Sequence, residues 1–212
     1  MKTIRIVAWC ALCAIAGTMA LTAGAQETPD EATKPAEVRT FDVDAVHSTT
    51  IFRVHHMGAG MFYGRFNDVG GTIEYDPATK QGLAMDLEVD INSIDSGNEN
   101  LDGHLKSPDF FNAVEFPKMT FKSTSATLVP EKDHPDGDVY KVEGDLTIHG
   151  VTKRISVDVV HVGHRMTRRG ERVGFECIFT IKRSEFDMPY GLEGDRLGDS
   201  TQIIVSLEAT AR

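Results

Sequence analysis

In the stretch Leu83-Ala-Met-Asp-Leu-Glu-Val-Asp-Ile91 every second residue is a large apolar one, and the residues between them are Ala84 and three acidic residues. A β-strand turns successive side chains to opposite faces, so this alternation predicts a strand with one dry face and one wet face. The same pattern recurs over 173–181 and 201–209. Several such strands in one short chain must bury their apolar faces together. An antiparallel sheet that curls around its apolar side does this.

The same alternation, followed along the chain, predicts eight strands, which are separated by turn sequences such as His149-Gly150. The strands are expected at about 48–57, 61–75 with a bend near Asn67, 83–91, 117–128, 139–148, 152–162, 173–183 and 201–209. Such a series of mostly consecutive strands predicts a mainly β, eight-stranded antiparallel barrel of the up-and-down kind.

Residues 92–116 interrupt the strand pattern and predict a short helical excursion. Ser107 and Pro108 are typical of an N-cap and a first helical residue, leading into Phe110-Phe111. A second short helix over 98–105 has weaker support.

The N-terminal region is typical of a secretory signal peptide. Lys2 and Arg5 precede an apolar run that is short for a membrane span, and Ala23-Gly24-Ala25 matches a cleavage signal. Residues 1–25 are therefore expected to be removed, 26–39 to form a disordered leader, and 40–212 to form the barrel domain. A periplasmic or secreted location follows from this expectation.

Charge and cysteine content narrow the function classes. The whole chain has a net charge of −10, and the predicted signal peptide holds basic but no acidic residues, so the mature chain is more acidic still. Such a surface repels phosphate backbones, which makes nucleic acid and anionic membrane surfaces poor partners, and no stable membrane insertion is expected after cleavage. Cys177 is the one cysteine outside the signal peptide, and its place on the apolar face of a strand predicts a small buried side chain.

The histidines offer weak candidates for a metal site. His55 and His56 are adjacent, so they face opposite ways on a strand, and only a soft set with Met57 and Met61 would suit copper. His161 and His164 also lack the geometry of a metal site on a strand that runs into Gly163, and a zinc site built from distant elements is left as an open alternative. The simpler interpretation is that these histidines pack or face solvent, and no metal and no cofactor are expected.

Acid–base catalysis is a second candidate class. Five titratable residues fall in or near the helical excursion and the first strand; these are His47, Asp95, Glu99, Asp102 and His104. Their spacing does not require them to meet in one cleft, and capping of the excursion explains them as well.

The apolar residues of the first half raise a third possibility. Many of them are expected to point inward, and an eight-stranded barrel either fills with its own side chains or holds one small ligand. The residues alone leave this choice open.

Several ordered motifs make the chain resemble the YceI-like family of exported, lipocalin-like proteins. The motifs are Asp44-Ala-Val-His47-Ser48, Phe52-Arg-Val-His55, Ile91-Asn-Ser-Ile-Asp95, Asp102-Gly-His104-Leu105, Phe116-Pro-Lys-Met-Thr-Phe121, Val142-Glu-Gly-Asp-Leu-Thr-Ile-His-Gly-Val-Thr152 and Arg183-Ser-Glu-Phe186. The resemblance covers about residues 41–210.

The resemblance implies a lipocalin-like barrel with an interior tunnel that binds a polyisoprenoid or another long-chain amphiphile, of polyprenyl or quinone type, without catalysis. It also implies a homodimer, for which Ile178 and Ile204 are candidate outward-facing residues. The alternatives are an enzyme or a stress-response module that acts on a small amphiphile at the barrel mouth. The ligand-binding residues expected on this basis are Phe52, Val54, Phe66, Leu87, Val89, Phe110, Phe111, Met119 and Phe121 in the tunnel, with His47, Asp102 and His104 near its polar end.

Two positions depart from the family pattern. Leu101 precedes Asp102 where the family often has arginine, which weakens the case for a charged clamp on the head group. Asp187 follows the Arg-Ser-Glu-Phe motif where a small residue or glycine is common.

Overall fold

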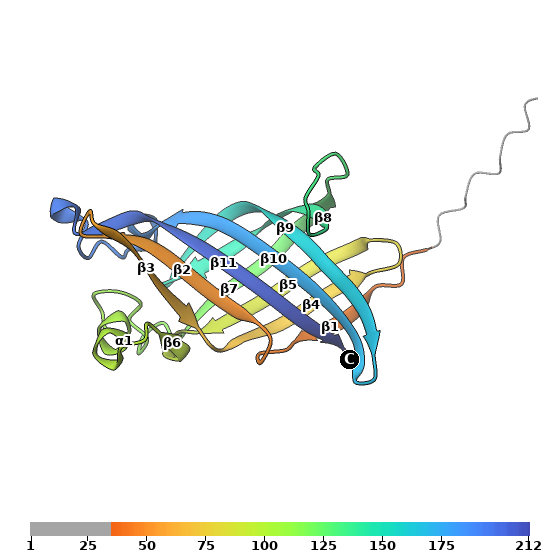
Figure 1. The fold of residues 1–212 in the computed structure, drawn as a ribbon, viewed down its shortest axis with the longest axis horizontal. Helices are drawn as coiled ribbons and strands as arrows, with labels where there is room; N and C mark the ends of the chain where they lie inside the picture. The colour runs from red at the N-terminus through yellow and green to blue at the C-terminus, as the bar shows by residue number, and fades with distance from the viewer. Residues whose placement is uncertain (1–34) are drawn as a thin grey trace, which may run out of the picture. The chain divides into compact units, whose positions relative to one another are not determined.

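A computed structural model describes residues 35–212, so the predicted signal peptide and most of the predicted leader lie outside the described residues. The described part is built of antiparallel strands with one short α-helix (Figure 1). The strands are β1 (Arg39–Val43), β2 (Thr49–His56), β3 (Gly60–Phe66), β4 (Val69–Asp76), β5 (Gln81–Asp90), β6 (Ile94–Asp95), β7 (Lys118–Leu128), β8 (Asp138–Ile148), β9 (Val151–Thr167), β10 (Gly170–Lys182) and β11 (Leu197–Ala211).

The strands close into a barrel. Its order is β1-β4-β5-β7-β8-β9-β10-β11, and β11 pairs again with β1. β2 pairs with the first part of β11, from Leu197 to Ser206, and β1 pairs with the last part, so β1 and β2 together take the place of one barrel strand. The chain likewise bends between β3 and β4, at the position expected near Asn67. The predicted eight-stranded antiparallel barrel is therefore confirmed.

The alternation that predicted the strands arises because each strand buries one face and exposes the other. In β5 the side chains of Leu83 and Met85 are buried, whereas those of Asp86 and Glu88 are exposed. β10 likewise turns Val173 and Phe175 to the interior. β1 was not predicted, because five residues are too few to display a period of two.

The helical excursion matches its prediction in part. The helix expected from Ser107 is wrong, whereas the second short helix expected over 98–105 is confirmed as α1 (Glu99–Leu105), whose N-cap Asn98 accepts a hydrogen bond from the backbone N–H of Leu101. The chain after Ser107 makes a turn, in which the Ser107 carbonyl accepts from the N–H groups of both Phe110 and Asn112. Asn112 has φ = 47°, a left-handed conformation that ends this turn.

Three short 3₁₀ segments complete the described chain, η1 (Ile91–Ser93), η2 (Arg183–Phe186) and η3 (Glu193–Asp195). The barrel end that carries α1 also carries the β2–β3 hairpin, and the C-terminus lies at the other end (Figure 1). Within 35–212 no helix has the length and apolar character needed to span a bilayer.

Candidate functional site

The barrel interior holds an apolar cavity of about 520 Å³. All the apolar residues expected to face the interior line it; these are Phe52, Val54, Phe66, Leu87, Val89, Phe110, Phe111, Met119 and Phe121. Another part of the cavity wall comes from β10 and β11, and its residues were missing from the predicted set. It includes Cys177, Phe179, Ile181, Ile203, Val205 and Leu207. The sequence did contain the pattern that predicts them, because they alternate with outward-facing residues as those of β5 do.

Two glycines leave room for large aromatic rings against the wall of the cavity. A Cβ atom at Gly64 would stand 2.3 Å from the ring of Phe52, which belongs to the neighbouring strand, and a Cβ atom at Gly144 would stand 2.5 Å from the ring of Phe121. Real Cβ atoms do not approach other atoms this closely. The two rings therefore lie in space that only glycine provides, and they do not project fully into the cavity.

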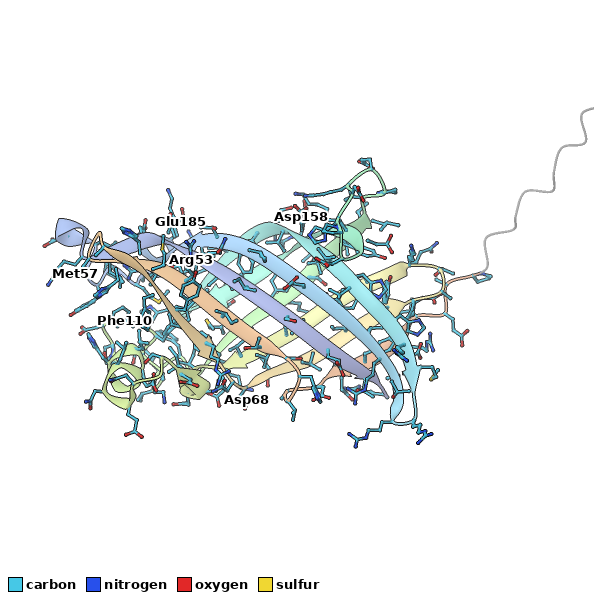
Figure 2. The ribbon with its side chains drawn as sticks, in the orientation of Figure 1. Arg53, Met57, Asp68, Phe110, Asp158 and Glu185 are labelled. Carbon is cyan, nitrogen blue, oxygen red and sulfur yellow. The ribbon has the colours of Figure 1, made fainter. Side chains whose placement is uncertain are left out.

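The cavity opens at the end of the barrel that carries α1. We call this opening the mouth and define it by His56, Met57, Leu101, His104, Phe110, Tyr190 and Arg196, all of which line the cavity. Figure 2 shows Met57 and Phe110 at this end. The rings of His104, Phe110 and Tyr190 contact one another, with centroids 4.9–5.0 Å apart. These contacts join α1 and the turn after it to the loop that precedes β11.

A buried arginine organises that loop. The Arg183 guanidinium donates to the carbonyls of Met188 and Gly198, each at 2.9 Å, and to those of Tyr190 and Leu197 at 3.2 and 3.3 Å. Because the side chain is almost wholly buried, these carbonyls replace water as partners of the charge. The family motif Arg-Ser-x-Phe therefore has a structural role here, in shaping one side of the mouth.

Asp187, the residue that departs from the family pattern, ends η2 in a left-handed conformation with φ = 54°. Glycine adopts this conformation without steric cost, which explains the preference for glycine at this position. The chain turns here in spite of the aspartate, so the departure leaves the loop intact.

The far end of the cavity is closed by aromatic side chains. Phe175 lines the cavity and packs against Tyr75 and His161, with centroids 5.4 and 5.2 Å away. Tyr75 and Tyr140 lie behind it and are almost wholly buried, and their hydroxyls are 2.8 Å apart. We call Tyr75, Tyr140, His161 and Phe175 the floor.

The predicted polar residues do not all reach the mouth. His104 lines it and pairs with Asp109 at 3.1 Å. Asp102 does not line the cavity; its Oδ1 accepts from the backbone N–H of Ser96 at 2.7 Å, which ties α1 to the segment before it. His104 therefore lies at the polar end as expected, whereas the expectation that Asp102 lines it is wrong.

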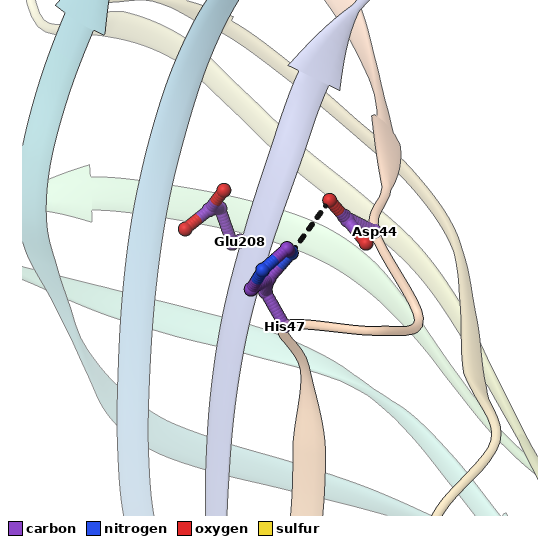
Figure 3. A group of neighbouring side chains, drawn as sticks. All are labelled: Asp44, His47 and Glu208. Carbon is purple, nitrogen blue, oxygen red and sulfur yellow. Dashed lines mark hydrogen bonds and ion pairs between the residues drawn. The ribbon is translucent and has the colours of Figure 1, made fainter.

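His47 lies in the turn between β1 and β2, outside the cavity, so its expected place at the polar end is wrong. Its Nδ1 is 2.9 Å from Oδ2 of Asp44, and Glu208 lies close to both residues (Figure 3). These three residues could in principle hold a cation. Arg172 already bridges Asp44, at 3.0 Å, and Glu208, so the carboxylates have a permanent positive partner. The cluster is an ion-pair network that joins the turn to β10 and β11.

Two other titratable candidates have structural partners: Asp95 accepts hydrogen bonds from Arg65 and Asn67, and His164 pairs with the buried Glu171. His161 belongs to the floor. Apart from the cluster around His47, residues 35–212 bring no three potential metal ligands together. Burial raises the pKa of Cys177 to about 12, so its thiol behaves as a small apolar group in the cavity wall.

Comparison with known proteins matches residues 41–209 to the family model described as the YceI-like domain. Protein YceI of Shigella flexneri is 31% identical over 168 residues, which cover 79% of this chain and 83% of that protein. BcnA of Burkholderia cenocepacia has a similar structure, with a TM-score of 0.68 and 25% identity over 79% of this chain and 99% of BcnA. A polyisoprenoid binding domain from Saccharophagus degradans shares the fold with a TM-score of 0.59, at 17% identity over 81% of this chain and 98% of that domain.

Proposed function

The chain belongs to the YceI-like family, and from this premise and the apolar cavity we propose that it binds an isoprenoid-like lipid of polyprenyl or quinone type. The hydrocarbon tail lies inside the barrel and the polar head lies at the mouth. The observation that carries the proposal is an interior cavity of about 520 Å³ walled almost entirely by apolar side chains. Each CH₂ group that leaves water for such a cavity contributes about 0.8 kcal/mol.

The mouth offers groups that suit a polar head. His56, His104 and Arg196 are hydrogen-bond donors or titratable groups there, whereas Leu101 adds apolar surface at the position where the family often has arginine. A hydroxyl, carbonyl or phosphate can accept hydrogen bonds from such side chains. This arrangement supports an amphiphile with a small head more than a wholly apolar ligand.

We propose that the protein carries or sequesters this lipid without changing it. Membership of the family and the polyisoprenoid-binding neighbour support a binding protein in general. The pair His104–Asp109 is the one acid–base pair at the mouth among the described residues, and its partners there, Phe110 and Tyr190, are aromatic rings. These aromatic neighbours support a role for the pair in packing around a bound ligand at the mouth.

We further propose a periplasmic or secreted location, which rests on the signal-peptide features of residues 1–25.

We also propose that the protein forms a homodimer. Ile178 is 54% exposed on the outer face of β10 and pairs across the strands with Ile204, so the two provide a small apolar surface for a second copy. Analytical ultracentrifugation of the wild type and of Ile178→Lys tests this, with loss of the dimer expected in the variant.

Native mass spectrometry of delipidated protein tests the binding function. After incubation with geranylgeraniol, we expect one prenol per chain, recovered chemically unchanged on extraction. Protein that stays empty with both geranylgeraniol and a short-chain ubiquinone would contradict the proposal. Recovery of a modified prenol would contradict its non-enzymatic part.

A further inference from the structure

The aromatic rings of the floor are deeply buried in the barrel interior. Tyr75 is wholly buried, Phe175 is 1% exposed and Tyr140 is 2% exposed. Phe41 and Ile73, which are also wholly buried, pack in the same core cluster. The cavity therefore ends against several layers of side chains, and the barrel does not form an open-ended tube.

A directed chain of hydrogen bonds fixes the floor. The Tyr140 hydroxyl donates to the backbone carbonyl of Lys80 at 3.0 Å, so it accepts from the Tyr75 hydroxyl at 2.8 Å. Tyr75 in turn accepts from Nδ1 of His161, at 3.4 Å. Each hydroxyl has one proton to donate, and in this order both hydroxyls and Nδ1 of His161 have partners. Nε2 of His161 is then left as a buried acceptor with no partner among the described atoms.

These bonds make the floor costly to displace. A ligand tail that moved Tyr75 or Tyr140 aside would break the hydrogen bonds of buried hydroxyls, and an apolar tail has no group to replace them. Such a tail would also have to push apart side chains that pack at the density of a protein core. The tail therefore stops at Phe175.

The usable depth of the cavity follows from the strands. From Ile181, near the mouth, to Phe175, at the floor, β10 rises by about 20 Å at its usual rise per residue. The strands of a small barrel tilt by roughly 35–45° from its axis, which shortens the depth to about 15 Å. A tail of three or four isoprene units is comparable with this depth, and a tail of nine units is far longer.

We infer that the floor of Tyr75, Tyr140, His161 and Phe175 sets an upper limit on tail length, so that the protein selects short isoprenoid tails over long ones. This inference rests on the proposed function and adds the ligand class to it. Up to the limit, each buried CH₂ raises affinity about fourfold. Beyond the limit, added CH₂ groups stay outside the mouth and raise it little.

Competition between prenols tests the limit. Delipidated wild-type protein is incubated in mild detergent with equal amounts of farnesol, geranylgeraniol and solanesol, and native mass spectrometry measures the occupancy of each. Added isoprene units stabilise a prenol in the detergent micelle, so a tail that gains nothing in the cavity loses occupancy. We expect farnesol and geranylgeraniol to exceed solanesol by at least tenfold.

A pair of variants on one strand separates depth from width. Phe175→Ala removes the surface of the floor, whereas Phe179→Ala removes the same side chain from the wall of β10, nearer the mouth. Micelle partition is identical for all proteins and cancels in the comparison. We expect Phe175→Ala to raise the ratio of geranylgeraniol to farnesol by at least fivefold, and Phe179→Ala to leave it within twofold.

Cys177→Met provides a second test that does not depend on an enlarged core. Cys177 lines the cavity next to the floor, so the longer side chain raises the floor and should shift occupancy toward farnesol. Equal or higher occupancy by solanesol in the wild type, or an unchanged distribution in both Phe175→Ala and Cys177→Met, would overturn the inference and leave the proposed function standing. Absence of all three prenols would overturn the proposed function itself.

Discussion

Phe52 lies across Gly64, its partner on the neighbouring strand, with ring atoms only 2.3 and 2.6 Å from the place where a Cβ atom would stand. The relationship links one backbone position to the width of the cavity. Any side chain at Gly64 must push the phenyl ring away from the wall, and the free space on that side is the cavity itself.

Gly64→Ala should therefore narrow the cavity. We expect prenol affinity to fall at least tenfold, with a stability loss of about 1–3 kcal/mol from overpacking. Gly60→Ala is the matched control, because Gly60 lies on the same strand and a Cβ atom there would meet nothing within 4 Å. Isothermal titration with geranylgeraniol measures both variants, and equal affinities would show that Phe52 does not control the width.

Val54→Trp should block the cavity near the mouth. Val54 is buried and lines the cavity, and the indole ring would take space that the proposed tail needs. We expect binding to disappear while the circular dichroism spectrum stays that of a β-barrel. Thr180→Trp adds the same ring to the outer face of β10 and should bind as the wild type does. Binding that survived in Val54→Trp would place the ligand elsewhere.

Arg183→Met should destabilise the barrel. The change removes the donor that serves the carbonyls of Met188, Tyr190, Leu197 and Gly198. Hydrogen bonds from a charged group contribute about 1.5–3 kcal/mol each, but the substitution also removes the cost of holding the guanidinium charge out of water, so a net loss of about 3 kcal/mol is expected. Urea unfolding gives the value.

The control for this change is Arg196→Met, at an exposed residue of the same loop, which should shift stability by less than about 0.5 kcal/mol. If Arg183→Met and Arg196→Met unfold at the same urea concentration, Arg183 does not hold the loop.

The Asp76 carboxylate should make the stability of the folded protein decrease at low pH. Its carboxylate accepts hydrogen bonds from the N–H groups of Glu37 and Ala78 and from the Thr79 hydroxyl, and these lower its pKa from 3.8 to about 2, with the Thr79 bond as the largest cause. A lowered pKa stabilises the folded state above about pH 4, and this contribution is lost as pH falls toward 2. Melting temperatures from pH 5 to pH 2 record the loss.

Two substitutions check the assignment to Asp76. Asp76→Asn should reduce the decline of the melting temperature in this window, whereas Asp133→Asn, in an exposed loop, should keep the decline of the wild type. An identical decline in Asp76→Asn would show that another group causes it.

The sequence predicted most of this architecture because alternation is a local property of a strand. In β5 large apolar residues occupy every second position, and the structure buries Leu83 and Met85 while it exposes Asp86 and Glu88. The helix over 98–105 was predicted correctly, but the one expected from Ser107 was wrong, because Ser107 and Pro108 are equally suited to a turn, and the left-handed Asn112 ends that turn at once. Only tertiary structure decides between the two.

The candidate site was predicted in part for the same reason. Inward positions of single strands, such as Phe52 and Val89, follow from alternation, and they line the cavity. The partner of a polar side chain does not follow from spacing. The Asp102 carboxylate accepts a hydrogen bond from the backbone N–H of Ser96, and the His47 ring pairs with Asp44. Both contacts depend on how the chain turns between the two residues. The floor also depends on residues far apart in sequence, since Tyr75 meets Tyr140 and His161 only after the barrel closes.

Photo-crosslinking tests most directly whether a hydrocarbon tail lies inside the barrel. Geranylgeraniol with a diazirine on its last isoprene unit is bound to the full-length protein, irradiated, and its attachment site is mapped by peptide mass spectrometry. We expect attachment close to the floor, at Phe175, Cys177 or residues of β11 such as Leu207, and none in Val54→Trp. Attachment to outward-facing residues such as Ile178, or unchanged labelling in Val54→Trp, would contradict a tail inside the barrel.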